Sequence, residues 1–279
     1  MSYAPIEEAL AGQGWGVIDL PRPEPVLEAR ERLLARLRAG KLENLQRLDD
    51  YHLAIGDNEK HFATLADLCD FYWEADLGRR IVAENLDVFR WLIGADLHVQ
   101  RYPYLRVVRP GAAGDEAPLH RDTYYGASPY ELSAIVPFTD MEPDSAVRVI
   151  SGSHLAPDRD YPFEQRQSPD VVPGSTKHRL GYPYAPRSLD PSLLARAEPV
   201  PLRVGQALLF GLSLVHGGGA NRTGRTRVST DIRVASSLAP VAWSRGVRED
   251  YFVPLCSSAV TRTARRYLAA NHGPDGASD

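Results

Sequence analysis

The triplet His120-Arg121-Asp122 and a second histidine far downstream, His216, are the sequence feature that most constrains the fold of this chain. In an extended backbone successive side chains alternate between two sides, so His120 and Asp122 would point to one side and Arg121 to the other. A fold that brings His216 to the same place joins two histidines and one carboxylate. Such a set occupies one face of an octahedral metal, leaves three positions open and suits non-haem Fe(II).

Short strand-like segments surround the triplet. Leu97–Val108 and Tyr130–Phe138 are rich in apolar and aromatic residues and predict strands, while Arg109–Gly114 predicts a turn. On the alternative interpretation, the triplet belongs to a surface loop with one histidine and a few solvated charges. The order of strand, turn, triplet and strand favours the metal site.

A second cluster lies around His216. The apolar run Gln206–Phe210 precedes this histidine, glycines follow it, and Arg227–Val234 predicts a further strand. We expect His216 at the end of one strand and Arg227 at the start of its hairpin partner, facing each other across the turn. The planar guanidinium of Arg227 could then bind the far carboxylate of a dicarboxylic co-substrate. The alternative is a loop histidine followed by a surface arginine.

The segments outside these clusters differ in pattern. Helices are predicted at Glu24–Arg38, His61–Trp73 and Leu86–Ile93, where leucines and aromatic residues recur at helical spacing. Residues 156–190 are rich in Pro, Tyr, Arg and Gly and show little periodicity. Because a loop of that length inside a compact domain is uncommon and usually functional, we expect it to be a lid over the site.

Four motifs in order resemble those of the Fe(II)/2-oxoglutarate-dependent dioxygenases, in particular the phytanoyl-CoA dioxygenase-like superfamily. They are the strand Gly14–Asp19, the metal motif Leu119–Thr123, the segment Ala146–His154 ending in Gly-Ser-His, and His216 through Arg227. The string His120–Gly126, followed by Ser-Pro-Tyr-Glu, is closer still to a bacterial branch that acts on sugar-like and natural-product substrates.

The resemblance implies a mainly β fold with helices (α+β). This is a double-stranded β-helix, or jelly-roll (cupin-like) barrel, of two antiparallel sheets with N-terminal helices packed outside one sheet. It implies a single domain over residues 1–279. Within it, residues 25–96 form a mainly helical support and residues 97–240 form the jelly-roll core, which carries the lid 156–190.

The resemblance also implies a site and its cofactors: Fe(II), with 2-oxoglutarate and O2 as co-substrates. The catalytic metal ligands would be His120, Asp122 and His216. The candidates for binding 2-oxoglutarate are Arg227, Ser229 on the same side of its strand, and Ser133, which stands where that branch would have an amide. The candidates for binding the substrate are Thr123, Tyr124, Tyr125 and Arg233. Halogenation is disfavoured, because Asp122 fills the position that a halide needs.

Composition excludes several function classes. The formal net charge of −4 gives no reason to expect a nucleic-acid partner, and no apolar run approaches the ~20 residues that span a bilayer. Two cysteines and an amino terminus without signal features predict a cytoplasmic protein. We leave the oligomeric state open.

The polar and aromatic residues near the site predict a polar small-molecule substrate, sugar- or cyclitol-derived, in natural-product (antibiotic) biosynthesis. Hydroxylation, cyclisation, desaturation and epimerisation all stay open. Two alternatives are a non-oxidative cupin-type metalloenzyme such as an isomerase, which would not need Arg227, and a non-catalytic jelly-roll binding module.

Overall fold

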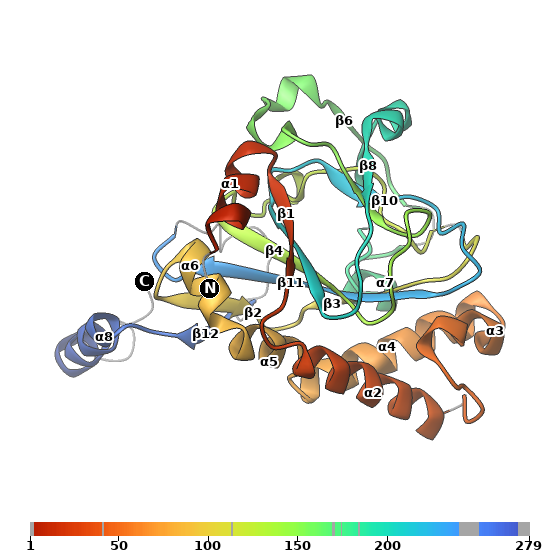
Figure 1. The fold of residues 1–279 in the computed structure, drawn as a ribbon, viewed down its shortest axis with the longest axis horizontal. Coiled ribbons are helices and arrows are strands. Elements are labelled where there is room, and N and C mark those ends of the chain that lie inside the picture. The colour runs from red at the N-terminus through yellow and green to blue at the C-terminus, as the bar shows by residue number, and fades with distance from the viewer. Residues whose placement is uncertain are drawn as a thin grey trace.

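Two antiparallel sheets face each other, and helices cover the outer face of the larger one (Figure 1). The computed structural model describes residues 3–40, 42–112, 114–168, 171–173, 175–183, 185–239 and 251–272. The predicted fold class, a double-stranded β-helix with helices outside one sheet, is confirmed. The expected end of the jelly-roll core, residue 240, lies outside the described residues. Among those described, no helix is both long and apolar enough to cross a membrane.

The large sheet has the strand order β1-β9-β4-β11-β2-β12, and β3 also pairs with β11. Its strands are β1 (Trp15–Asp19), β2 (Leu97–Gln100), β3 (Tyr104–Val108), β4 (Glu131–Pro137), β9 (Gln206–Gly211), β11 (Arg227–Ser236) and β12 (Phe252–Cys256). Strand β11 pairs along its length with β4 on one side and with β3 and then β2 on the other. This central position buries both of its faces.

The small sheet has the order β10-β5-β8, and a separate hairpin pairs β6 with β7. These strands are β5 (Val147–Val149), β6 (Phe163–Gln165), β7 (Arg187–Leu189), β8 (Glu198–Val200) and β10 (His216–Gly218). An apolar core joins the two sheets: Ile135, Leu208 and Phe210 of the large sheet pack with Val147 and Val149 of the small one. This core holds the two sheets together.

A second, larger apolar core lies between the large sheet and the helices. The helices are α1 (Ala4–Gly12), α2 (Glu24–Ala39), α3 (Tyr51–Ile55), α4 (Asn58–Glu74), α5 (Leu77–Glu84), α6 (Leu86–Ile93), α7 (Thr176–Arg179) and α8 (Ala259–His272). Helix α2 buries Val26, Ala29, Leu33 and Leu37, which share one face, and it ends before Gly40. Helix α4 packs on β3 and α5 on β2, so these helices support the strands that pair with β11.

One predicted strand is divided in the structure. The segment Leu97–Val108 forms β2 and β3, with a break at Arg101-Tyr102-Pro103. Proline has no N–H to donate to a neighbouring strand, so it interrupts the pairing. Both pieces still pair with β11, because that strand is long enough for two partners.

The predicted hairpin of His216 and Arg227 is wrong. His216 begins β10, which pairs with β5 in the small sheet, whereas Arg227 begins β11 in the large sheet. The two residues therefore lie on opposite sheets rather than on two strands of one hairpin. Alternating patterns predict strands, but they do not identify the partner of each strand.

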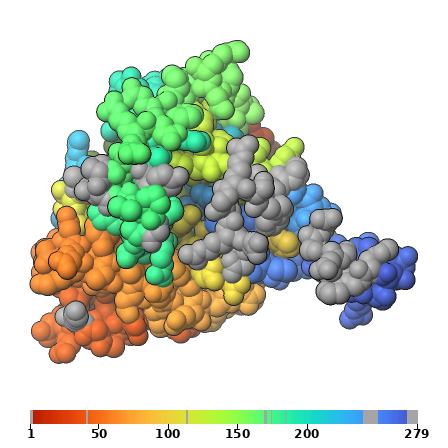
Figure 2. Space-filling view, turned by 180° about the vertical axis from the view of Figure 1, so that it is seen from behind, coloured from red at the N-terminus to blue at the C-terminus, as the bar shows by residue number. Residues whose placement is uncertain are grey.

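The segment 156–190 is not the featureless loop that its composition predicts. It contains the β6–β7 hairpin and the short helix α7. Figure 2 shows this green segment spread over one face of the molecule and reaching the orange helices. There Arg179 pairs with Asp70 of α4, and Lys177 lies over the ring of Phe62. An inner part of the segment is thus attached to the support helices.

Candidate metal centre

Two backbone hydrogen bonds bring the distant histidines together. The N–H of His120 donates to the carbonyl of His216 (2.9 Å), and the N–H of His216 donates to the carbonyl of His120 (3.0 Å). In such an antiparallel pair the two side chains project from the same side. The imidazole centroids accordingly lie 4.5 Å apart.

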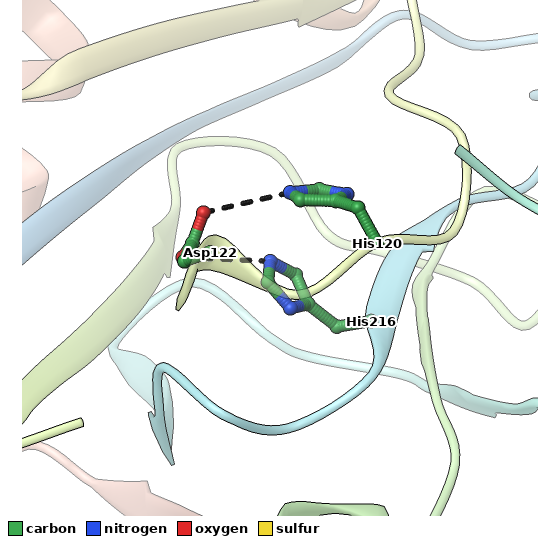
Figure 3. Close-up of side chains that lie close together, drawn as sticks. All are labelled: His120, Asp122 and His216. Atoms are coloured by element: carbon green, nitrogen blue, oxygen red, sulfur yellow. Dashed lines mark ion pairs between the residues drawn. The ribbon is translucent and has the colours of Figure 1, made fainter. Parts of the chain in front are cut away.

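Asp122 joins the two histidines through the extended backbone of Arg121 (φ −111°, ψ 139°). As the period of two predicts, His120 and Asp122 point to the same side. His120 Nε2 lies 3.5 Å from Oδ1 of Asp122, and His216 Nε2 lies 3.8 Å from Oδ2 (Figure 3). One ligand atom from each residue lies within 4.8 Å of the others, so the structure groups the three predicted metal ligands.

Hydrogen bonds and charges prepare these groups to bind a cation. His120 Nδ1 lies 2.7 Å from the carbonyl of Pro118, and His216 Nδ1 lies 3.1 Å from that of Leu214, so each ring presents Nε2 to Asp122. Burial lowers the pKa of His216 to about 4, which keeps the imidazole neutral. Burial alone would raise the pKa of Asp122, but Arg233 and the histidines hold it well below its usual range.

The donor set fits a divalent transition metal. Oδ2 of Asp122 is buried and has no hydrogen-bond partner among the described residues. Two imidazoles face the same point, and together with one carboxylate they are the donors of the three-residue non-haem Fe(II) site. A metal would satisfy the unpaired carboxylate oxygen, which is otherwise costly to bury.

Glycines after His216 allow the two motifs to touch. A Cβ on Gly217 would lie 2.8 Å from the carbonyl of Pro118 and 2.9 Å from the backbone of Leu119, and one on Gly218 would lie 2.8 Å from the Cβ of Glu116. The segment that leads to His120 therefore rests directly on the backbone of β10. Glycine is required here for close approach of two chain segments.

Arg121, whose side chain points away from the ligands, and the Gly-Ser-His turn connect the two metal motifs. Arg121 is buried and donates to the carbonyls of Ser153 (2.6 Å) and Ala156 (2.9 Å), and it also contacts Asp158. The hydroxyl of Ser153 accepts the N–H of Val215 (2.8 Å), the residue before His216. One turn thus contacts both metal motifs, although it contributes no ligand.

Polar residues line the inner face of β11. Arg227, Ser229, Asp231 and Arg233 alternate with the core residues of the same strand, so they share a side. Arg227 is buried, and its Nη1 donates to the carbonyl of Ser145 (2.7 Å). Burial lowers the pKa of Arg227 to about 10, which leaves it charged at neutral pH.

The other two candidates for the 2-oxoglutarate site also lie between the sheets. Ser229 is buried and pairs across the strands with Arg106. Ser133 on β4 is fully buried and donates to Oδ1 of Asp231 (2.5 Å). The hydroxyl of Ser133 therefore already has a hydrogen-bond partner in Asp231, whereas Ser229 makes no hydrogen bond with Asp231.

The predicted substrate residues separate into two groups. The ring of Tyr125 lies 5.7 Å from that of His120, and Nη2 of Arg233 lies 2.9 Å from Oδ1 of Asp122. Tyr124 points elsewhere: its hydroxyl donates to the carbonyl of Tyr161 (2.6 Å) inside a separate apolar cluster. Thr123 is half-buried, and its N–H donates to the carbonyl of Leu212.

Two acidic residues near the centre were missed at the sequence level. Asp231 interacts electrostatically with His216 and Arg233. Glu131 is buried, its Oε1 accepts the N–H of Ser128 (2.9 Å), and burial raises its pKa. The period of two from Arg227 through Ser229 could have identified Asp231. Glu131 lies at the start of a predicted strand, and no local signal marked it as an interior residue.

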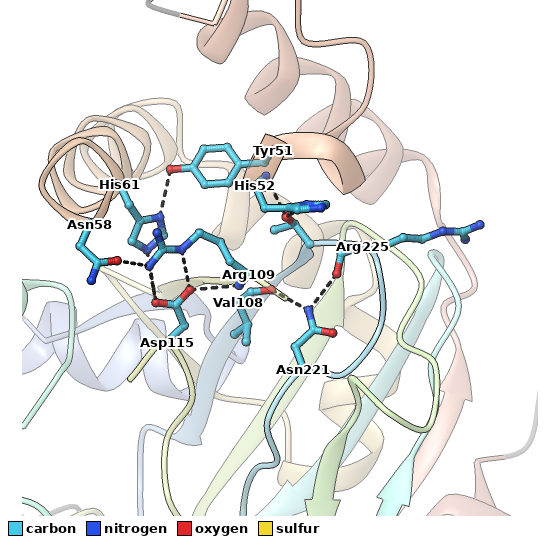
Figure 4. A network of polar contacts seen from close by, with 10 residues as sticks. Tyr51, His52, Asn58, His61, Val108, Arg109, Asp115, Asn221 and Arg225 are labelled. Carbon is cyan, nitrogen blue, oxygen red and sulfur yellow. Dashed lines mark hydrogen bonds and ion pairs between the residues drawn. The ribbon is translucent and has the colours of Figure 1, made fainter. Parts of the chain in front are cut away.

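A buried network anchors the loop that leads to the triplet (Figure 4). Arg109 donates through Nε (2.8 Å) and Nη2 (2.9 Å) to Asp115, and Nη2 also donates to Asn58 of α4 (2.7 Å). His61 of α4 lies beside the same carboxylate, 3.9 Å away, and its Nδ1 lies 3.1 Å from the hydroxyl of Tyr51. This network ties the loop before His120 to the helical support.

Comparisons with known proteins agree with this architecture. The family model described as phytanoyl-CoA dioxygenase (PhyH) matches residues 36–229. No curated protein sequence matches the chain significantly.

Solved structures share the fold at low sequence identity. A nickel complex of the non-haem monooxygenase ThoJ is 20% identical (TM-score 0.53), and its apo form is 21% identical (TM-score 0.55). The apo form of EctD from S. alaskensis is 18% identical (TM-score 0.50). Each likeness covers 91% of this chain and 84% of the other. At this identity the likeness concerns the fold.

Proposed function

Because this chain belongs to the phytanoyl-CoA dioxygenase family, we propose that it is an Fe(II)- and 2-oxoglutarate-dependent oxygenase with a metal centre of His120, Asp122 and His216. The cofactor set of this family is Fe(II), with 2-oxoglutarate and O2 as co-substrates. When bound, the metal supplies the O2 chemistry that couples oxidative decarboxylation of 2-oxoglutarate to oxidation of a C–H bond. The protein binds, orients and shields the reactants.

One observation carries the proposal. Ligand atoms of two imidazoles and one carboxylate lie within 4.8 Å of one another, and one carboxylate oxygen has no partner among the described residues. Three protein donors leave room for a chelating co-substrate and O2, which a site closed by four ligands does not.

Arg227 and Ser229 would bind the far carboxylate of 2-oxoglutarate. The contact of Arg227 with the carbonyl of Ser145 fixes one edge of the guanidinium, and its Nε has no partner among the described residues. A charge-assisted hydrogen bond from a rigid, buried guanidinium is strong and directional. Ser133 is a weaker candidate, because its hydroxyl already donates to Asp231.

The substrate would be a polar small molecule of natural-product biosynthesis, sugar- or cyclitol-derived. Support comes from Tyr125, which is partly exposed beside His120 and offers a flat ring with a polar tip. The other candidate contacts are Thr123, Arg233 and Tyr124. Of these, Tyr124 would act indirectly, because its hydroxyl donates to the carbonyl of Tyr161. The oxidation could end in hydroxylation, ring closure, desaturation or epimerisation.

The test of the function uses purified protein and three single variants, His120→Ala, Asp122→Ala and His216→Ala. We expect each to lose Fe(II) stoichiometry and 2-oxoglutarate-dependent O2 uptake while keeping its circular dichroism. The exposed histidine His178 provides the matched control, His178→Ala. Normal iron content in a triad variant contradicts the metal assignment. Iron binding by wild type without any 2-oxoglutarate turnover would favour a cupin-type isomerase instead.

The test of the substrate class is succinate formation with a mixed panel. Aminoglycoside-like compounds, cyclitols and oligosaccharides represent the proposed class, and fatty acyl-CoA thioesters represent the other. Turnover of thioesters without any response to the polar compounds would overturn the proposed substrate class and leave the cofactor assignment intact.

A further inference from the structure

Arg233 lies on the polar face of β11, far from Arg227, and contacts the metal cluster directly. Its Nη2 lies 2.9 Å from Oδ1 of Asp122, and both side chains are almost entirely buried. Its backbone N–H donates to Oε1 of Gln100 (3.2 Å), and the ring of Tyr104 lies 5.7 Å from the guanidinium carbon. These contacts hold the guanidinium against the carboxylate.

The three cluster residues are oriented by different means. Each histidine is held by a backbone carbonyl near its Nδ1, from Pro118 in one case and Leu214 in the other. Asp122 has no such backbone support: Oδ1 lies against Arg233, and Oδ2 has no partner among the described residues. Apart from the two imidazoles, the contact that directs this carboxylate therefore comes from one side chain on another strand.

We propose that Arg233 is a positioning residue that holds the Asp122 carboxylate toward the two imidazoles and thereby sets the affinity of the centre for a divalent metal. This inference rests on the proposed function. Groups that orient metal ligands commonly determine metal affinity, although they do not touch the metal.

Arg233 has two opposing effects on metal affinity, so a measurement of that affinity tests the proposal. A positive charge close to a cation site weakens metal binding by repulsion. A fixed carboxylate strengthens binding, because the ligand does not have to be ordered when the metal arrives. If orientation dominates, removal of the guanidinium lowers metal affinity; if repulsion dominates, removal raises it.

The experiment measures Mn(II) binding to the metal-free full-length protein under anaerobic conditions, by calorimetry and by electron paramagnetic resonance. Arg233→Met removes the donors and keeps the length of the side chain. We expect its affinity for Mn(II) to fall about 10- to 100-fold. Arg233→Lys keeps the charge without the planar fork, and we expect a smaller loss. Arg225→Met is the matched control, since Arg225 is exposed and pairs only weakly with Glu142 (3.6 Å).

The outcomes separate this inference from the proposed function. Wild-type protein that binds no Mn(II) overturns both. Normal wild-type binding, with unchanged or tighter binding by Arg233→Met, overturns only the positioning role. If that variant also raised the KM of the substrate, Arg233 would be a substrate contact, as the sequence predicts. Should Arg233→Met fail to fold, the folded Arg233→Lys protein decides, and wild-type affinity together with an unaltered Mn(II) spectrum contradicts the proposal.

Discussion

His120 and His216 form a reciprocal pair of backbone hydrogen bonds, 2.9 and 3.0 Å long, between chain segments that are distant in the sequence. The separation of the two imidazoles is therefore determined by strand pairing rather than by side-chain packing. Any change that moves one strand against the other should alter metal binding without touching a ligand.

The first prediction tests this relationship through Gly217. The variant Gly217→Ala would place a Cβ 2.8 Å from the carbonyl of Pro118, and a backbone atom cannot easily move away. Overpacking of this kind costs about 1–3 kcal/mol, and the strain falls on the bridge between the two histidines. We expect weaker Mn(II) binding, measured by calorimetry, and a lower melting temperature. The control is Gly224→Ala, because a Cβ there would meet no atom within 4 Å. Equal metal affinity in both variants contradicts the argument.

The second prediction concerns Arg227. A buried, charge-assisted contact contributes about 1.5–3 kcal/mol, so Arg227→Ala should weaken 2-oxoglutarate binding roughly 10- to 150-fold. Titration of the protein with Mn(II) and 2-oxoglutarate measures the loss. The neighbouring Arg225 is exposed and should be insensitive to the same change. Sensitivity of Arg225 in place of Arg227 would show that the co-substrate arginine is misassigned.

The third prediction concerns the residue between the two ligands of the triplet. Arg121→Met leaves the carbonyl of Ala156 without its donor and removes one of two donors from that of Ser153, and an unsatisfied buried group costs about 1–3 kcal/mol. We expect a lower free energy of unfolding in urea and a weaker affinity for Mn(II), because the same turn supports Val215. Arg159→Met is the control, since Arg159 is exposed on the same segment. A stability loss with full metal affinity would limit Arg121 to a structural role.

The metal triplet could be predicted because its geometry is local. Period-two alternation places His120 and Asp122 on one side whatever the rest of the fold does. The strand Glu131–Pro137 and the helix Leu86–Ile93 were predictable for the same reason, since their patterns lie within a few residues.

Long-range pairing could not be predicted in this way. The partner of β10 is β5, and nothing in the residues around His216 identifies it. The same holds for the ion pair of Arg233 with Asp122 and for the hydrogen bond of Arg109 with Asn58. Each of these contacts joins elements whose proximity is a result of the whole fold. The composition of residues 156–190 likewise predicts a loop, whereas tertiary packing produces a hairpin and a helix.

The fourth prediction is that residues 156–190 act as a lid. The segment reaches the metal centre where the N–H of Arg187 donates to the hydroxyl of Tyr125 (2.7 Å), and that ring lies beside His120. A ligand that orders a segment lowers its open population and hence its rate of proteolysis. Trypsin should therefore cut at Arg166 and Lys177 more slowly when Mn(II) and 2-oxoglutarate are bound, and slower still with substrate. Cleavage at the basic residues of α8 is the internal control. If the ligands slow trypsin cleavage equally in residues 156–190 and in α8, or slow it in neither, the segment is not a lid.

The last prediction concerns the pH dependence of stability through His61. Burial and the nearby charge of Arg109 lower the pKa of His61 to about 4, below the value of about 6.5 for an unfolded histidine. Between these two values the unfolded chain binds a proton that the folded protein does not. Stability from this residue is therefore fully present above about pH 6.5 and is lost as the pH falls toward 4, by up to about 3 kcal/mol.

His61→Gln removes the titration, so the free energy of unfolding of this variant should change less between about pH 7 and pH 5. The measurement is urea unfolding of the metal-free protein at several pH values, because bound metal would add its own pH dependence. The quantity compared is the slope of the free energy of unfolding against pH. The absolute free energy is not compared, because the variant also loses the contact of His61 with Tyr51. The exposed His178 provides the control His178→Gln, which should keep the wild-type slope. If His61→Gln keeps that slope as well, the acid sensitivity arises elsewhere, and burial and the charge of Arg109 do not hold His61 neutral.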